Sequence, residues 1–195
     1  WEIMAHRKEQ VKILIIIFVF IGFSIFVKIA SYQPLSESDL IFVDVGQGDC
    51  VHLKAGEKNI LIDGGGKADY NIGKNTLKPY LLKNGVKYVN LSLATHKHTD
   101  HFKGLEELWK EGMADEPKTG ITARKIFYVS ENIKIETLWP LSLEKDKTQD
   151  ENANCTVFMI YFNGYKVLVT GDLDVAGEKK MIAYYEESDK LKADI

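Results

Sequence analysis

The longest apolar stretch of the chain lies near its N-terminus. Residues Ile13–Val27 are all apolar or small, and Lys12 and Lys28 flank them. If both lysine side chains reach outward to the lipid headgroups, Val11–Ala30 supplies the roughly 20 residues that a transmembrane helix needs. The pattern therefore predicts a membrane-spanning helix, with a cleaved signal peptide and a buried helix of the soluble domain as the alternatives.

This apolar stretch divides the chain into three parts. We expect a cytoplasmic stub and transmembrane anchor at 1–30, a polar linker at 31–39 and one globular domain at 40–195. Because Arg7 and Lys8 precede the apolar run, the N-terminal side should stay in the cytoplasm. The domain would then lie outside the cell membrane in a single-pass protein, or be secreted if the leader is cleaved.

Beyond the linker, short runs rich in β-branched and aromatic residues predict strands. Turn-forming residues separate them, and Asn163-Gly164 favours a tight hairpin. The predicted strands are Leu40–Val45, Cys50–Leu53, Asn59–Asp63, Lys87–Ala94, Lys125–Val129, Ile133–Leu138, Thr156–Phe162 and Tyr165–Thr170. The first three should form an antiparallel meander.

Three further segments carry apolar residues at helical spacing. The predicted helices are Asn75–Asn84, Phe102–Glu111 and Ala176–Tyr185. Leu191–Ile195 is typical of the start of another strand. Because strands, loops and helices alternate, we expect a layered α/β architecture.

Composition narrows this picture. With 45% hydrophobic and 27% charged residues, the chain suits one globular domain plus a short segment. A net charge of −3 argues against a surface that holds duplex DNA by its phosphates. Cys50 and Cys155 are too few for a disulfide framework, so we expect two buried thiols, with a bridge as the alternative. Nothing in the sequence indicates an oligomeric state.

Three of the five histidines lie within six residues, directly after a predicted strand, in the string His96-Lys97-His98-Thr99-Asp100-His101. Imidazole and carboxylate together suit a transition-metal ion, whereas calcium and magnesium prefer oxygen ligands. The spacing of His96 and His98 lets both rings point to one side and share one ion. Asp100 and His101 can bind a second ion at the start of the next helix. The alternative is a histidine-rich surface loop.

The string from Thr95 to His101, followed by Gly104-Leu105, resembles the H-x-H-x-D-H signature of the metallo-β-lactamase fold. Three other segments resemble the extracellular hydrolase domain of the competence protein ComEC: Phe42–Asp49, Ile60–Gly65 and Val167–Asp172. The resemblance runs from about Asp39 to the end of the chain. It implies an αββα sandwich that binds two divalent transition-metal ions, zinc or manganese.

The resemblance also implies roles for single residues. Asp172 would bridge the ions, since one carboxylate can hold two cations about 3.5–4 Å apart; the alternative is a helix cap. Asp63 would support the metal loop from behind, or form a turn before glycines. Asn152 would face the metal or organise water, or serve an ordinary loop. The predicted metal ligands are His96, His98, Asp100, His101 and Asp172, with Asp100 also catalytic as a proton acceptor.

The sequence departs from the resembled pattern in two places. No histidine follows His101, and Asn152-Ala153-Asn154-Cys155 stands where Asn-x-x-Ser is usual. The resembled family has a further histidine motif after the strand that Leu191–Ile195 would begin. We therefore expect an incomplete second half of the sandwich, a more weakly bound second ion and a fragment that could lack activity.

The predicted function is metal-dependent hydrolysis outside the membrane, with a metal-bound hydroxide as the nucleophile. The resemblance implies phosphodiesterase or nuclease-like activity on a nucleic acid strand or a small phosphoester, in the context of competence and DNA uptake. A non-phosphate ester or a lactam is an alternative substrate, because a fold does not determine a function. An alternative of another class is a membrane-tethered binding or accessory module with a degenerate metal site.

Overall fold

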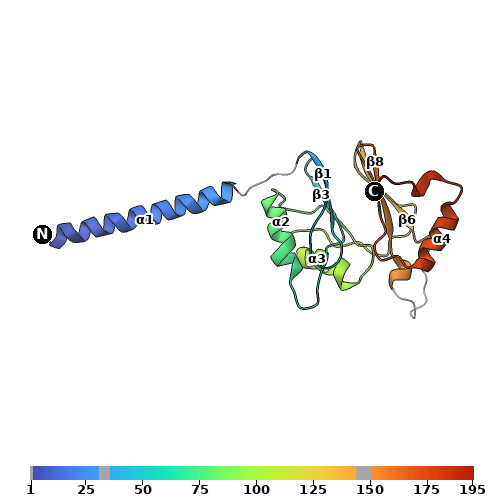
Figure 1. The fold of residues 1–195 in the computed structure, drawn as a ribbon, viewed down its shortest axis with the longest axis horizontal. Coiled ribbons are helices and arrows are strands. Elements are labelled where there is room, and N and C mark those ends of the chain that lie inside the picture. The colour runs from blue at the N-terminus through green and yellow to red at the C-terminus, as the bar shows by residue number, and fades with distance from the viewer. Residues whose placement is uncertain (1, 31–35, 144–150) are drawn as a thin grey trace.

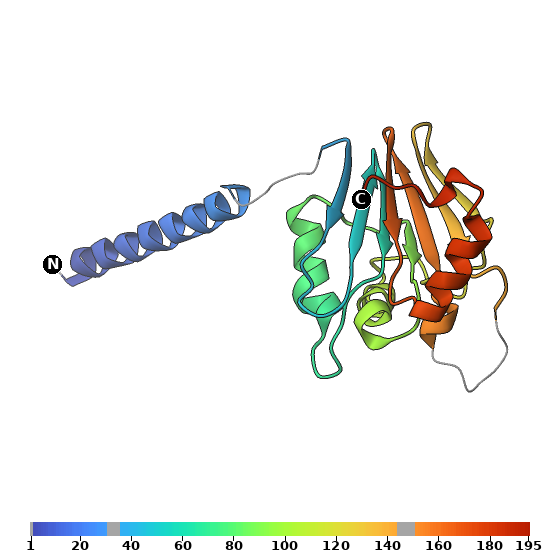
Figure 2. The same ribbon diagram turned by 45° about the vertical axis from the view of Figure 1, so that its right-hand side comes forward.

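A computed structural model describes residues 2–30, 36–143 and 151–195. The N-terminal helix α1, Glu2–Ala30, extends away from the rest of the chain in both views (Figures 1 and 2). Its segment Gln10–Ala30 is long and apolar enough to cross a membrane, and its most apolar window is 0% buried. A signal sequence would show the same features, so the structure leaves the membrane anchor and the cleaved signal open and does not support the alternative of a helix buried in the soluble domain.

The first sheet contains four strands in the order β1-β2-β3-β4. Their bounds are Ser38–Phe42, Val51–Ala55, Lys58–Ile62 and Leu91–Leu93. The first three pair antiparallel, which confirms the predicted meander, and β4 pairs parallel to β3. β1, β3 and β4 therefore run in the same direction and end at the same edge of the sheet.

The second sheet is an antiparallel meander in the order β5-β6-β7-β8. Its strands are Ile126–Ser130, Ile133–Trp139, Val157–Phe162 and Tyr165–Val169. Between the last two, Asn163 and Gly164 have φ angles of 49° and 94°. Two positive φ values are what a two-residue hairpin turn of this twist requires, so the Asn-Gly prediction is confirmed.

Helices cover both outer faces of the paired sheets (Figure 2). A π-helical turn, Gly73–Leu77, leads into α2, Lys78–Lys83, and α3 follows at Thr99–Lys110. These pack on the first sheet, whereas α4, Val175–Tyr185, packs on the second. Short 3₁₀ turns lie at Glu151–Asn154 and Asp189–Leu191. The predicted αββα layering is confirmed.

Strand alternation fills the layers between these elements. In β3, Ile60 and Ile62 point into the core between the sheets, while Leu61 points toward α2 and α3. In β7, Phe158 joins the central core and Met159 the core beneath α4. Because successive strand residues face opposite sides, the central strands β2, β3, β6 and β7 are buried on two faces, as their apolar sequences require.

The structure differs from several of the predicted bounds, including those of β1, β4 and α3. β1 starts at Ser38, inside the predicted linker, because Ser38 and Asp39 pair with β2. Residues 31–35 of that linker lie outside the described residues. β4 is shorter than predicted, and the outer side of this segment is bonded to residues 113–118 of the following loop. α3 begins at Thr99 rather than Phe102, because apolar spacing does not register its polar first turn.

The end of the chain also differs from its prediction. Leu191 completes a 3₁₀ turn instead of beginning a strand. The backbones of Asp194 and Ile195 nevertheless bond to Lys166 and Leu168 on the outer edge of β8. The segment therefore adds a short extended pairing to the second sheet.

Candidate metal centre

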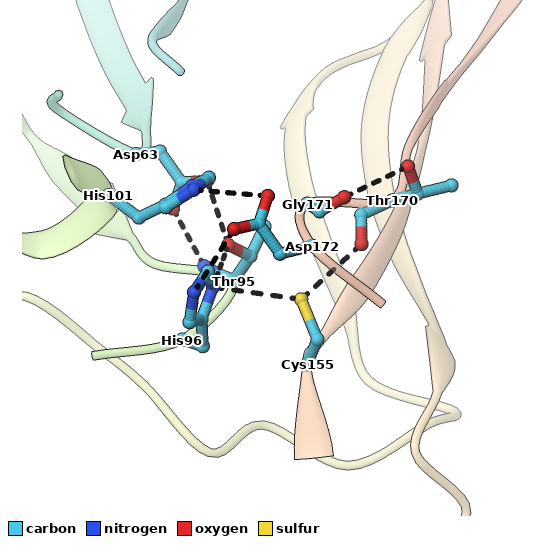
Figure 3. A network of polar contacts seen from close by, with 8 residues as sticks. All are labelled: Asp63, Thr95, His96, His101, Cys155, Thr170, Gly171 and Asp172. Atoms are coloured by element: carbon cyan, nitrogen blue, oxygen red, sulfur yellow. Dashed lines mark hydrogen bonds and ion pairs between the residues drawn. The ribbon is translucent and has the colours of Figure 1, made fainter. Parts of the chain in front are cut away.

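The candidate site lies at the edge of the sandwich where three strands end. Asp63 directly follows β3, His96 lies three residues beyond β4, and Asp172 lies three residues beyond β8. His101 comes from the first helical turn of α3. Strand direction and one helix start thus bring residues far apart in sequence to one place (Figure 3).

Asp172 presents a different oxygen to each of two histidines. Its Oδ1 lies 3.3 Å from His101 Nε2, and its Oδ2 lies 3.9 Å from His96 Nε2. One ligand atom from each of these three residues falls within 4.8 Å of the others. The predicted convergence of Asp172 with the histidine cluster is therefore present. The helix-cap alternative for Asp172 is wrong, because Asp174 caps α4 by accepting a 2.6 Å hydrogen bond from Gly177 N.

His98 and Asp100 lie beside this group without belonging to it. The ring centroids of His98 and His96 are 4.5 Å apart, so His98 borders the same space. Asp100 is in the first turn of α3, and its charge acts to raise the pKa of both His96 and His101. Their roles as ligands stay predictions.

Asp63 holds His101 from behind. This buried carboxylate accepts 2.8 Å hydrogen bonds from Thr95 N, Thr95 Oγ1 and His101 Nδ1. With its Nδ1 directed at Asp63, His101 turns its Nε2 toward Asp172. Asp49 also offers an oxygen within 4.8 Å of Asp63 and His101, on the exposed side of the site. This geometry is what the predicted supporting role of Asp63 requires.

His96 carries a buried nitrogen suited to a metal ion. Its Nδ1 lies 3.0 Å from Thr95 Oγ1. Among the described residues, none forms a hydrogen bond with its buried Nε2. A buried polar atom without a partner is costly, and an ion bound at Nε2 would remove that cost. The residues present therefore fit a transition-metal ion.

The pKa values of the two histidines move in opposite directions. Burial, together with the charges of His101 and His98, lowers the pKa of His96 to about 4. Burial alone would also lower the pKa of His101, but the hydrogen bond and charge of Asp63, aided by Asp172, raise it to about 9. At neutral pH His96 therefore keeps a lone pair for a metal ion, whereas His101 must release a proton from Nε2 before it can bind one.

Two glycines let the loops approach closely enough to form the site. Gly171 has a φ of 53°, and a Cβ there would lie 2.7 Å from both Cys155 Sγ and Thr95 Oγ1. A Cβ on Gly48 would lie 1.6 Å from the carbonyl oxygen of Asp100. Any side chain at these positions would displace the segments that carry Asp172 and Asp100.

Asn152 is connected to the site through Cys155. Asn152 is in the 3₁₀ turn before Cys155 and accepts a 3.2 Å hydrogen bond from Cys155 N. Cys155 Sγ lies 3.8 Å from His96 Nδ1. The role of Asn152 stays a prediction. Cys50 and Cys155 are both buried and free, as expected for thiols rather than a bridge.

Thr95 is the functional candidate that sequence reasoning missed. Its buried hydroxyl touches both Asp63 and His96. The sequence does show a hydroxyl residue between the predicted strand and the first histidine. Its contact with Asp63 could not be predicted, because the two residues are 32 positions apart and only the fold brings them together.

Comparison with known proteins agrees with this geometry. The family described as "Anti-Pycsar protein Apyc1" matches residues 47–183, which is more than half of the chain. The Apyc1 protein of Paenibacillus sp. (strain J14) is 36% identical over 101 residues, covering 50% of this chain and 35% of its own.

Two competence proteins match a larger share of the chain. ComE operon protein 3 of Bacillus subtilis is 27% identical, covering 82% of this chain and 25% of its own length. Competence protein ComA of Neisseria gonorrhoeae is 28% identical, covering 78% and 22%. This chain thus spans about a quarter of the length of these relatives.

Solved structures identify the fold. The metallo-beta-lactamase GOB-18 from Elizabethkingia meningoseptica superposes with a TM-score of 0.53 at 16% identity, covering 84% of this chain and 75% of that one. The class B3 di-zinc metallo-beta-lactamase LRA-12 from an Alaskan soil metagenome gives 0.51 at 16% identity, covering 84% and 76%. This chain therefore has the metallo-β-lactamase fold, resembles the ComEC-type competence proteins and belongs to the family of the anti-Pycsar protein Apyc1.

Proposed function

We propose that this domain is a metal-dependent hydrolase whose site holds two divalent transition-metal ions, zinc or manganese. The observation that carries the proposal is the placement of Asp172, whose two oxygens face the Nε2 atoms of His96 and His101. Membership of the Apyc1 family and the likeness to metallo-β-lactamases, one of which is described as di-zinc, support it.

The side chains divide into ligands and the groups that hold them. His96 and His98 would bind one ion, Asp100 and His101 the other, and Asp172 both. When bound, such ions lower the pKa of water to near 7 and neutralise charge on a substrate oxygen. Asp63 keeps a proton on His101 Nδ1, so Nε2 is the nitrogen that would bind an ion once its own proton is released. The Asp100 carboxylate could also accept a proton from the attacking water.

A phosphodiester is the substrate class that we propose, on a nucleic acid strand or a small phosphoester. The similarity to competence proteins and to Apyc1 supports this choice over a lactam or another ester. The side chain of Asp172 is 44% exposed, so a substrate can reach it from solvent. With α1 in the membrane and the basic residues before its apolar run in the cytoplasm, the domain would act outside the cell.

Metal content and turnover of matched aspartate variants test the proposal. The zinc- or manganese-loaded chain should hold close to two ions and hydrolyse bis(p-nitrophenyl) phosphate or single-stranded DNA in preference to nitrocefin. Asp172→Asn should reduce turnover at least about 100-fold, because several kcal/mol of charge stabilisation depend on the bridging carboxylate. Asp174→Asn is the control, since Asp174 caps α4 outside the ligand group.

A binding or accessory module with a degenerate site is the second candidate. It is favoured by the absence of a histidine between His101 and Asp172. Two results together would contradict the hydrolase and support the module. The chain would bind no transition metal, and Asp172→Asn and Asp174→Asn would have the same metal content and turnover.

A further inference from the structure

The hydroxyl of Thr95 lies between a buried carboxylate and a metal-facing histidine (Figure 3). Thr95 Oγ1 is 2.8 Å from Asp63 Oδ2 and 3.0 Å from His96 Nδ1. Thr95 and Asp63 are both 0% exposed, and His96 is 4% exposed. Solvent therefore has little access to this chain of contacts.

The chemistry of the three groups determines the direction of both hydrogen bonds. An ionised carboxylate only accepts, and a hydroxyl has one proton to donate. The Thr95 proton is therefore directed to Asp63, and a lone pair of the same oxygen remains for His96. His96 must then donate from Nδ1, which leaves the lone pair on Nε2, the atom that faces Asp172.

The backbone around Thr95 is held independently of its hydroxyl. Thr95 N donates to Asp63 Oδ1 at 2.8 Å, and Thr95 O accepts from Thr156 N at 2.8 Å. Among the described residues, a second polar atom near His96 Nδ1 is Cys155 Sγ, at 3.8 Å. This thiol donates a hydrogen bond to the carbonyl oxygen of Thr170 at 3.3 Å. The hydroxyl is therefore the short contact that orients this ring.

We propose that Thr95 is a positioning residue that holds His96 in the tautomer with a proton on Nδ1 and a lone pair on Nε2. One carboxylate, Asp63, thereby orients both histidines, His101 directly and His96 through Thr95. The inference deepens the proposed function, since the lone pair on Nε2 is directed toward the proposed ions. Removing the hydroxyl would let His96 place its proton on Nε2 and so block the metal-binding atom.

The first test needs no variant and no metal. In the metal-free chain near pH 7.5, ¹⁵N chemical shifts of the two ring nitrogens of His96 should show a protonated Nδ1 and an unprotonated Nε2. The opposite tautomer would overturn the proposal. This measurement does not depend on activity, so the inference can fail or hold separately from the proposed function.

The second test compares three variants. Thr95→Val keeps the side-chain shape without the hydroxyl, and it should shift the His96 tautomer and weaken zinc binding about 10–100-fold in competition with a chelator. Thr95→Ser keeps the hydroxyl and should restore both. Thr156→Val is the control, because buried Thr156 Oγ1 donates to Ile121 O at 3.1 Å, outside the ligand group.

The comparison has defined failures. Unchanged tautomer and affinity in Thr95→Val would overturn the proposal, as would a Thr95→Ser variant that fails as fully as Thr95→Val. An equal loss in Thr156→Val would assign the effect to general packing and would also overturn it.

Discussion

Asp63 is a buried charge placed where the fold can satisfy it. Burying a carboxylate is costly unless it is hydrogen-bonded, and three donors from Thr95 and His101 meet this requirement. Its φ of 58° is unusual for a residue other than glycine. Strained and buried polar residues cluster at functional sites, and here this backbone conformation directs the carboxylate toward Thr95 and His101.

Asp63→Asn should weaken metal binding. An amide can accept at one end only, so its NH₂ group would meet the donors of Thr95 and His101 and favour the wrong tautomer of His101. We expect zinc affinity to fall about 10–100-fold, measured by chelator competition. Asp69→Asn, at an exposed ion pair with Lys67, is the control. Equal affinity in both variants would contradict the supporting role of Asp63.

His52 should make the domain less stable in acid. It is 0% exposed, and its ring nitrogens contact Tyr80 OH at 3.0 Å and Asn59 Oδ1 at 3.2 Å. Burial lowers its pKa from 6.5, so below that pH the unfolded chain takes up a proton that the folded chain resists. The resulting stability is present above pH 6.5 and is lost as the pH falls toward the folded pKa.

Urea denaturation between pH 7.5 and 5 measures this effect. The free energy of unfolding should fall by up to about 1.4 kcal/mol per pH unit because of His52. His52→Gln should show a shallower dependence on pH, although His96 contributes with the same sign and His101, whose pKa is raised, with the opposite sign above pH 6.5. Equal slopes for the two proteins would show that His52 is protonated in the folded state.

At the scale of elements, the site depends on close contacts between loops and helix starts that only glycine allows. The loop after β1 meets the start of α3 at Gly48, where a Cβ would lie 1.6 Å from the carbonyl oxygen of Asp100. Gly46 in the same loop has a similar positive φ, 79° against 84°, but nothing lies within 4 Å of its Cβ position. A side chain at Gly46 would therefore meet backbone strain alone, whereas a side chain at Gly48 would meet strain and a steric clash.

Gly48→Ala should be worse than Gly46→Ala. Strain alone should cost about 1 kcal/mol in Gly46→Ala, whereas Gly48→Ala should lose at least about 1–3 kcal/mol more in urea denaturation, because backbone must move. It should also weaken the binding of the ion that Asp100 is proposed to hold, measured by metal titration. Similar losses in the two variants would show that the close approach does not matter.

The local sequence pattern predicted most helices and strands. It did not predict the start of α3 or the contact between Asp63 and Thr95. The β1–β3 meander, the β7–β8 hairpin and α4 follow from alternation, an Asn-Gly turn and helical spacing. The start of α3 does not, since its N-cap residue His98 makes no side-chain cap hydrogen bond. The ligand string was visible because it is contiguous, whereas the Asp63–Thr95 contact depends on β3 pairing with β4.

At the scale of the whole molecule, the described side chains of α1 do not contribute to the hydrophobic cores of the sandwich. The most apolar window of α1 is 0% buried, and all three cores draw on residues of the sandwich. Removing residues 1–35 should therefore leave the melting temperature of the domain unchanged. A fall of several degrees would show that α1 contributes to the fold.

The same deletion should change where the protein resides. The full chain should co-sediment with phosphatidylcholine–phosphatidylglycerol vesicles, and the shortened chain should stay in the supernatant. Ile21→Arg in the full chain is the matched variant. It should reduce co-sedimentation, because a charge at the centre of a spanning helix costs about 2.5–3.5 kcal/mol. Sedimentation of the shortened chain would place the membrane contact on the domain itself.

The direction of β1 has a consequence for what the site can reach. β1 begins at Ser38, at the edge of the sheet opposite to the one where Asp63 follows the parallel-running β3. Five strand residues span about 16 Å, so the start of β1 and the candidate site lie roughly this far apart along the strand direction. With α1 in a bilayer, we expect the candidate site to meet water-borne phosphoesters rather than headgroups of the same leaflet.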